Sequence, residues 1–166
     1  MNFERLLQGA SKPGFNRWKL NVGLWKMIPF NYPHRLKLSG VTDTEVHVKI
    51  PFIRKNKNHV GTVHACCQAT AAEYSSGMSI LRHFSPKEYR LLMQNISVEY
   101  TYQAKTACVT KAIMLPERVQ ELKEVISKEG KTLIVQEINC YDTEGNIVSI
   151  TRVNWQIKAW AKVKSK

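Results

Sequence analysis

Residues 62–81 constrain the fold of this 166-residue chain more than any other segment. They contain no proline and few β-branched residues, and alanine, cysteine and serine would occupy every face of a helix formed here. A helix that is apolar nearly all round is a buried helix. Its small side chains also let the surrounding backbone approach closely, so we expect a buried central helix.

Strand patterns flank this segment on both sides. Apolar and polar residues alternate with period two in these stretches, which is typical of half-buried strands. The strands are predicted at residues 35–38, 45–52, 95–102, 106–115, 132–141 and 148–163. Six antiparallel strands and one buried helix favour an α+β fold in which a curved sheet wraps around the helix.

Two further helices are expected outside the central one. Residues 16–28 have a roughly helical apolar rhythm that Pro29 ends. Pro116 begins a charged helix at its favoured first position, and Gly130 ends that helix. At this length a single domain, 1–166, is the default.

The composition excludes disorder, because 43% of the residues are hydrophobic. The formal net charge of +12 raises the question of a nucleic-acid partner. Only Arg54, Lys55 and Lys57 cluster tightly, and no zinc-finger spacing, ribonucleoprotein aromatic motif or basic heptad region occurs. The pattern disfavours nucleic acid and favours a solvated basic surface or an anionic small-molecule ligand.

The cysteines and the apolar runs indicate a compartment. Four cysteines occur without a CxxC pair or a secretory signal, which favours a reducing environment. No apolar run approaches the roughly 20 residues that a spanning helix needs. We therefore expect a soluble cytoplasmic protein with no membrane partner.

Glu73 is the single carboxylate between Glu45 and Glu88, and it lies in the middle of the predicted apolar helix. Burying an ionised carboxylate costs several kcal/mol unless it is paired, and the usual outcome is a raised pKa. One interpretation is a structural hydrogen bond or a polar spot at a subunit interface. The other is a catalytic carboxylate with a raised pKa.

The residues that precede the helix form a polar entrance to it. Free backbone N–H groups at a helix N-terminus can hold a developing oxyanion, and Asn58 and His64 add polar side chains there. From His64 to Glu73 a helix would turn by about 900°, so the two side chains leave opposite faces. A two-fold dimer would bring Glu73 of one copy towards the entrance of the other.

The run from Asn58 to Gly77 resembles the hotdog-fold acyl-CoA thioesterases, especially the phenylacetate-pathway type and an uncharacterised branch related to it. That type carries an Asn, a His six residues later, small residues that open the central helix, and an Asp or Glu nine residues after the His. Asn58, His64 and Glu73 occupy those positions. The resemblance covers residues 33–164 as a hotdog core and leaves 1–32 as an N-terminal helical extension.

The resemblance implies a thioester hydrolase with two sites per homodimer, or a dimer of dimers. The thioester carbonyl would accept a hydrogen bond from a backbone N–H near Ala65, at a helix entrance that includes Gly61 and Cys66. Glu73 of the partner would activate water as a base or attack directly, while Asn58 and His64 position the water or the thioester. Coenzyme A would be part of the substrate, with no separate cofactor and no metal.

Two features of the entrance bear on this implied activity. Related enzymes often have Gly-Gly after the His, so Ala65 and Cys66 would narrow the acyl channel or weaken activity. Coenzyme A carries three phosphate groups, and Arg54, Lys55 and Lys57 lead directly into Asn58, so we expect this cluster to steer the nucleotide end of the ligand. The alternative function is a non-catalytic module that binds acyl-CoA or fatty acyl groups, because the fold does not settle the function.

Two rival chemistries are conceivable at the same entrance. Cys66 or Cys67 beside His64 could form a nucleophile–base pair, although a cysteine in an apolar helix is usually a small buried hydrophobe. His59, His64 and Glu73 could bind a metal, but no HExxH or comparable ligand spacing is present. The remaining histidines have no partner that the sequence identifies and are expected at the surface or in structural roles, namely His34, His47 and His83.

Overall fold

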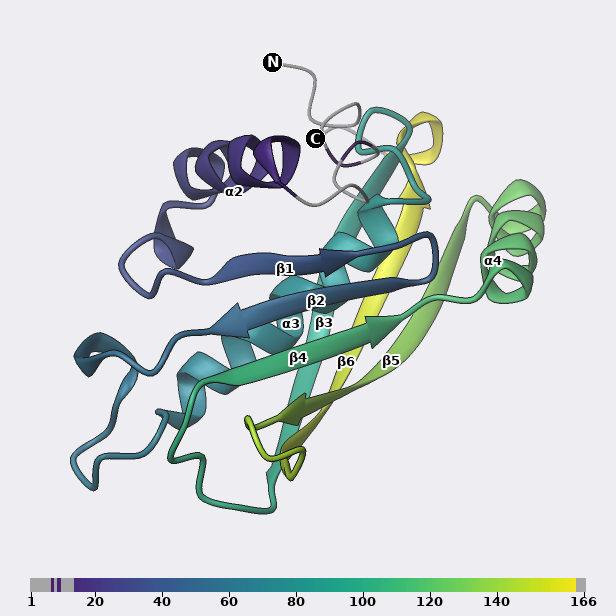
Figure 1. Cartoon of the computed structure of the whole chain (residues 1–166). Helices are drawn as coiled ribbons and strands as arrows, with labels where there is room; N and C mark the ends of the chain where they lie inside the picture. The colour runs from purple at the N-terminus through teal and green to yellow at the C-terminus, as the bar shows by residue number, and fades with distance from the viewer. Residues whose placement is uncertain (1–6, 8, 10–13, 164–166) are drawn as a thin grey trace.

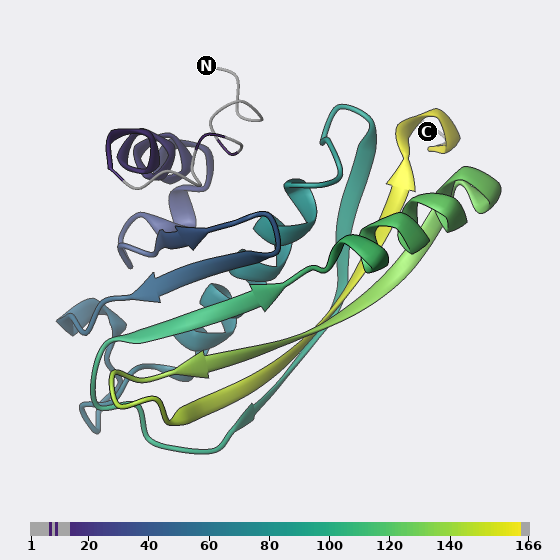
Figure 2. The same ribbon diagram turned by 45° about the vertical axis from the view of Figure 1, so that its right-hand side comes forward.

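The structure is a computed structural model that describes Leu7, Gly9 and residues 14–163. One antiparallel six-stranded sheet, in the order β1-β2-β4-β5-β6-β3, curves around the helix α3, Ala65–Leu81 (Figures 1 and 2). The strands are β1 Lys37–Val41, β2 Glu45–Ile50, β3 Tyr89–Tyr100, β4 Cys108–Ile113, β5 Lys131–Tyr141 and β6 Ile147–Ala159. The predicted α+β architecture of a curved sheet around a central helix is confirmed.

The central helix begins three residues later than the apolar pattern suggests. Thr62 belongs to the turn that Asn58 holds, and Val63 bridges to Lys57 and donates its N–H to the carbonyl of Ala104. His64 is the N-cap, with φ −60° and ψ 137°, and its ring Nδ1 accepts the N–H of Cys66 at 3.1 Å. Capping by a side chain therefore sets the start of α3.

Two apolar clusters surround α3. The first joins the N-terminal half of α3 to β1, β2 and the helix α2, Phe15–Met27, through residues such as Leu24, Val48 and Ala71. The second joins its C-terminal half to β5, β6 and the helix α4, Pro116–Glu129, through residues such as Leu122 and Ile157. α4 ends as predicted at Gly130, which adopts φ 75°, a left-handed conformation that suits glycine.

All six strands differ from their predicted bounds by one residue or more, and the two largest differences are at the start of β3 and the end of β6. β3 begins at Tyr89, six residues before the predicted start. The sequence does not reveal this first half, because apolar and polar residues do not alternate cleanly there. Pairing with β6 nevertheless makes it a strand. β6 ends at Ala159, and the prediction that it continues to residue 163 is wrong. The chain turns there into the 3-10 helix η3, Trp160–Lys162, where Trp160 donates its indole N–H to the carbonyl of Pro86.

α2 lies beside β1, at one edge of the sheet (Figure 1). It ends two residues before Pro29, which opens the 3-10 helix η1, Pro29–Asn31. None of the helices in the described ranges is long and apolar enough to cross a membrane.

Candidate active site

One stripe of α3 stays partly open. Cys66 is exposed, while Ala69, Thr70 and Glu73 are half-buried. Residues three and four apart share one face of a helix, so these side chains form a single row. The sheet and the other helices bury most of the rest of α3.

Glu73 lies in this row without a partner for its charge. No salt bridge or hydrogen bond of the described residues reaches its carboxylate, and burial raises its pKa above the ordinary value. One turn later, Gly77 leaves room for the side chain: a β-carbon there would lie 3.8 Å from Glu73 Oε1 and 3.4 Å from the ring of Trp155. A half-buried, unpaired carboxylate with a raised pKa can act as a proton acceptor.

The helix entrance offers fewer free N–H groups than the sequence suggests. Cys66 donates its N–H to His64 Nδ1, and Gly61 donates its N–H to the carbonyl of Asn58 at 3.1 Å. Of the three expected donors, only Ala65 has an N–H that no described residue accepts. Ala65 is therefore the single backbone donor of the predicted set that remains available to a ligand.

Asn58 shapes the entrance through its own loop. Its Oδ1 accepts the N–H groups of Val60 and Thr62, at 3.1 and 3.0 Å, and its Nδ2 donates to Thr62 Oγ1 at 2.8 Å. These bonds hold the turn at residues 58–62 that leads into α3. The structure thus places Asn58 in the scaffold of the entrance, with its amide engaged.

A pocket of about 240 Å³ opens beside the helix entrance. It brings together side chains from η1 and the turn after it, from the segment before α3 and from the first two turns of α3, namely Phe30, His34, Lys55, His64, Cys66, Cys67 and Thr70. Because His64 Nδ1 accepts the N–H of Cys66, a neutral ring carries its proton on Nε2. That N–H can donate to a ligand in the pocket.

Asn56 holds the walls of this pocket together, and the sequence analysis missed it. Its side chain is fully buried, donates to the carbonyls of His34 and Pro51, and contacts His34 Nδ1 at 3.0 Å. Its carbonyl accepts the N–H of His64 at 2.7 Å. The sequence gives no sign that Asn56 is buried, because it stands among basic residues and its partner His34 lies 22 residues earlier in the chain.

The basic cluster does not converge on one point. Arg54 and Lys55 are exposed on the 3-10 helix η2, Arg54–Asn56, and Lys55 alone of the cluster lines the pocket. Lys57 Nζ lies 3.7 Å above the ring of Phe52. Lys55 is thus the cation at the mouth of the pocket.

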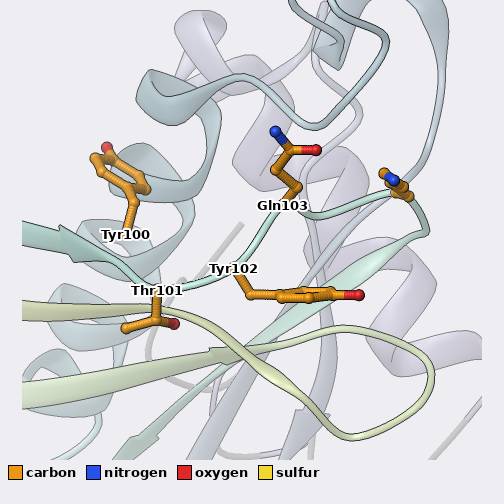
Figure 3. Close-up of a pocket in the computed structure, with 5 residues that line it drawn as sticks. Tyr100, Thr101, Tyr102 and Gln103 are labelled. Atoms are coloured by element: carbon orange, nitrogen blue, oxygen red, sulfur yellow. The ribbon is translucent and has the colours of Figure 1, made fainter.

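A second hollow, of about 410 Å³, lies where β3 ends (Figure 3). It is lined by residues 100–103 and Lys105, and the Tyr102 ring and the Gln103 side chain point in different directions around it. Tyr100 connects it to the helix entrance, because its hydroxyl donates to the carbonyl of Ala65 at 3.0 Å. The pocket and this hollow therefore both adjoin the start of α3.

His64 and Glu73 do not meet within one chain, although the predicted reason needs correction. The turn count from His64 assumed a helical residue, whereas His64 is the extended N-cap. The separation is axial, because the eight residues from Ala65, the first residue of α3, to Glu73 correspond to about 12 Å along the helix. A small group cannot contact both side chains of the same copy.

The rival chemistries find little support in the geometry. Cys67 is buried, and burial raises the pKa of its thiol to about 12, which disfavours a nucleophile. Among the residues that the structure describes, no three His, Cys, Asp or Glu side chains lie close enough to hold a metal ion. His34 contacts Asn56, and His47 pairs with Glu45 at 2.8 Å, so both have structural partners.

Comparison with known proteins places this architecture. Residues 16–157 match a protein family described as a domain of unknown function, DUF4442. No curated protein sequence matches the chain. Solved structures with the same architecture have 11–21% sequence identity to the chain, which shows the fold alone.

Three of these structures illustrate the similarity. A Pseudomonas aeruginosa protein of unknown function, called a probable thioesterase, is 21% identical, has a TM-score of 0.79, and aligns over 90% of this chain and 99% of its own. A thioesterase from Haemophilus influenzae is 11% identical, with a TM-score of 0.71 and coverages of 93% and 98%. A Staphylococcus aureus thioesterase is 14% identical, with a TM-score of 0.65 and coverages of 78% and 98%. The predicted hotdog fold is confirmed.

The Staphylococcus aureus protein has been solved as two alanine variants. One replaces a glutamine, and the other replaces a glutamate fifteen residues further along that chain.

Proposed function

This chain belongs to the DUF4442 family, and we propose that it hydrolyses acyl thioesters as a homodimer. The observation that carries the proposal is Glu73, a half-buried carboxylate with a raised pKa and no ionic partner among the described residues. A carboxylate whose pKa is raised by burial is a stronger base than an ordinary glutamate, which suits a general base.

The reaction uses two groups. The Glu73 carboxylate takes a proton from water, and the resulting hydroxide attacks the thioester carbonyl carbon. The carbonyl oxygen becomes an oxyanion that accepts the N–H of Ala65 at the positive end of the α3 dipole. Collapse of the intermediate breaks the C–S bond, and the thiolate takes the proton back from Glu73, which releases a carboxylic acid and a free thiol.

A second copy completes the site. Because about 12 Å of helix separates Ala65 from Glu73, one copy cannot supply both groups to one carbonyl. An antiparallel pair of α3 helices with the two-fold axis near Ala69, midway between them, sets Glu73 of each copy across from Ala65 of the other. Ala69 is small and half-buried, which permits close approach of the two helices.

The spacing of the polar residues supports this assignment. Asn58 and Glu73 are separated by fifteen residues, the same interval that separates the glutamine and the glutamate replaced in the Staphylococcus aureus thioesterase. Asn58 acts here by shaping the entrance loop, and His64 donates Nε2–H to the water or the thioester.

The coenzyme A part of the substrate enters the pocket past the basic residues at its opening. Lys55 lines the pocket and Arg54 is exposed next to it, so both attract the phosphates of coenzyme A before binding. Charge reversal at Arg54 and Lys55 should raise KM for acyl-CoA at low salt and lose that effect at high salt. An unchanged KM would assign these residues to solvation.

Two substitutions test the chemistry on a panel of acyl-CoA substrates. Glu73→Gln removes the base while it keeps the shape of the side chain. Ala65→Pro removes the N–H with little change to the backbone, because proline is favoured at the first helical position and His64 already has the extended backbone that a following proline requires. We expect each variant to lower kcat about 100-fold or more, while Ala65→Ser, which keeps the N–H, retains activity.

Mixing the two inactive variants tests the shared site. In a heterodimer of Glu73→Gln and Ala65→Pro copies, one of the two sites has both an intact Glu73 and an intact Ala65 N–H. Random exchange should therefore restore roughly a quarter of wild-type activity. No recovery after verified exchange would overturn the shared site, and a wild type that hydrolyses no thioester would overturn the proposed function.

A further inference from the structure

A groove lies between α2 and the outer side of β1 and β2. It consists of two hollows of about 430 and 470 Å³, which share Trp25 and Lys37 in their linings. Aromatic and basic side chains dominate it, and none of the described residues that line either hollow is acidic. We call it the aromatic–basic groove and define it by Trp18, Trp25, Tyr32, Arg35, Lys37 and Lys49.

Two lysines of the groove face each other, and no described residue supplies a counter-charge to them. Lys37 of β1 and Lys49 of β2 are direct partners in the antiparallel register, so their side chains leave the same face of the sheet. Like charges directly opposite are destabilising. No carboxylate of the described residues forms a salt bridge with either lysine, so a bound anion would relieve the repulsion.

Arg35 adds a third cation to the groove, although its backbone adopts an unfavourable conformation. It has φ 51°, and it is the one residue other than glycine with a positive φ in the described part of the chain. The left-handed region is unfavourable for a residue with a β-carbon. Glycine or asparagine would suit this backbone better, so the guanidinium that lines the groove is the feature that an arginine adds here.

The aromatic rings of the groove are held in place. Trp25 donates its indole N–H to the carbonyl of Leu36 at 2.7 Å, and Tyr32 packs edge-on against Trp25 with ring centroids 5.8 Å apart. Tyr32 is 61% exposed. A fixed, open aromatic ring beside several cations suits a ligand that combines a flat base with phosphates.

We propose that the aromatic–basic groove binds a nucleoside phosphate. The base stacks on Tyr32, and the phosphates bridge Lys37, Lys49 and Arg35. The hollows are of the size that single small ligands occupy in proteins. The ligand is either the nucleotide end of a coenzyme A thioester or a free nucleotide, and binding stands apart from hydrolysis.

Calorimetric titration with adenosine 3′,5′-diphosphate at low salt tests the groove. We expect saturable binding that weakens tenfold or more in the Lys37→Ala/Lys49→Ala variant and about fivefold in Tyr32→Ala. Lys111→Ala, on the exposed side of β4, is the matched control and should bind like wild type. The proposal is overturned by no binding, by equal binding of the groove variants, or by binding of single-stranded RNA through these residues when the mononucleotide does not bind.

The Arg35→Gly variant separates the role of Arg35 in ligand binding from its effect on the stability of the fold. Glycine relieves the left-handed backbone, so the variant should unfold at the same or a higher temperature while it binds the diphosphate several-fold more weakly. Binding equal to wild type would remove Arg35 from the site.

Hydrolysis assays identify the source of the nucleotide. If the groove variants raise KM for acyl-CoA but not for the matching acyl-pantetheine, with kcat unchanged, the nucleotide belongs to the substrate. If both KM values stay constant while diphosphate binding is lost, the ligand is a free nucleotide. The titrations decide on the groove even if no thioester is hydrolysed.

Discussion

The two edge strands of the sheet, β1 and β3, differ in how far other elements cover their backbone. At β1, side chains of α2 satisfy the outward backbone groups: Asn21 bonds both the N–H and the carbonyl of Leu38, at 2.7 and 3.1 Å, and Arg17 and Trp25 donate to the carbonyls of Ser39 and Leu36. The strand is short and carries a bulge between Leu38 and Gly40. Short length, a bulge and a covering helix are the usual ways to close an edge.

At β3 the same protection is missing. The strand has 12 residues, and no side chain of another described element bonds to its backbone. Its inner face is also open, since Met93 and Tyr100 are 39% and 47% exposed, whereas Leu38 on the inner face of β1 is 1% exposed. A long, partly apolar edge is a template for pairing with another chain. The difference supports β3 as the edge that receives the second copy.

The largest expected effect comes from a charge on the open edge. Val98 is half-buried on the inner face of β3, opposite Thr151 of β6. Val98→Lys would bury a cation between the two copies, so we expect a monomer and a loss of activity of 100-fold or more. Light scattering with size-exclusion chromatography gives the mass, and thioester assays give the rate.

Leu133→Lys is the matched control for that variant. Leu133 is 61% exposed on the outer face of the same sheet, so the same change there should leave the dimer and its activity intact. A dimeric, active Val98→Lys protein would contradict the assignment of β3.

The next largest effect is expected when the hydrogen bonds between α2 and the edge strand β1 are removed. Asn21→Leu removes both hydrogen bonds to Leu38 and leaves a buried N–H and carbonyl unsatisfied, which should lower the free energy of unfolding by about 2–4 kcal/mol. Chemical denaturation measures it. Asn16→Leu, at an exposed position of the same helix, should change it by less than about 0.5 kcal/mol. Similar values for the two variants would mean that Asn21 does not seal the edge.

A smaller effect on the free energy of unfolding is expected at Glu73, where the substitution should stabilise the protein. Burial raises the pKa of this carboxyl, so the folded protein holds the proton more tightly than the unfolded chain. Wild-type stability therefore falls as the pH rises from the ordinary glutamate value of 4.5 through the raised pKa. Glu73→Gln should remove that fall and raise the free energy of unfolding at neutral pH by up to about 1 kcal/mol.

Thermal unfolding of wild type and Glu73→Gln across pH 4–8 checks this dependence. The activity of wild type should fall as the pH drops through the same raised pKa, because the base becomes protonated. Parallel stability curves for the two proteins would show that the carboxylate is not desolvated in the folded protein.

A change of similar size is expected at the β1 edge, which α2 covers. Trp25→Phe keeps an aromatic ring but loses the hydrogen bond to the carbonyl of Leu36, so we expect a loss of about 1 kcal/mol in the free energy of unfolding. Tyr32→Phe, an exposed neighbour in the same groove, serves as control in the same denaturation series. If both variants lose equal stability, packing in the groove and not the bond to Leu36 explains the effect.

Much of the fold follows from local patterns. Alternation in β2 and the proline and glycine at the ends of α4 predict these elements because burial and capping act over a few residues. The first half of β3 was missed, since its residues alternate poorly and its position depends on pairing with β6. Pairing partners about 60 residues apart leave no local mark in the sequence.

The candidate site divides in the same way. Glu73 stands out in the sequence as a lone acid in an apolar segment, and the structure keeps it half-buried. The engagement of Asn58 within its loop, the capping of Cys66 by His64, and the buried contacts of Asn56 are properties of backbone conformation. Residue types alone do not reveal which N–H groups are already used.

By itself, the sequence determined that a small-residue helix is buried under an antiparallel sheet, because hydrophobic periodicity and side-chain size are local properties. It also determined that a single carboxylate lies in that helix. Only the tertiary structure decided that no described residue accepts the N–H of Ala65, that α2 covers β1 while the described residues leave β3 open, and that Arg35, Lys37 and Lys49 share one groove. Those features depend on contacts between distant segments, where geometry and not composition sets which groups are satisfied.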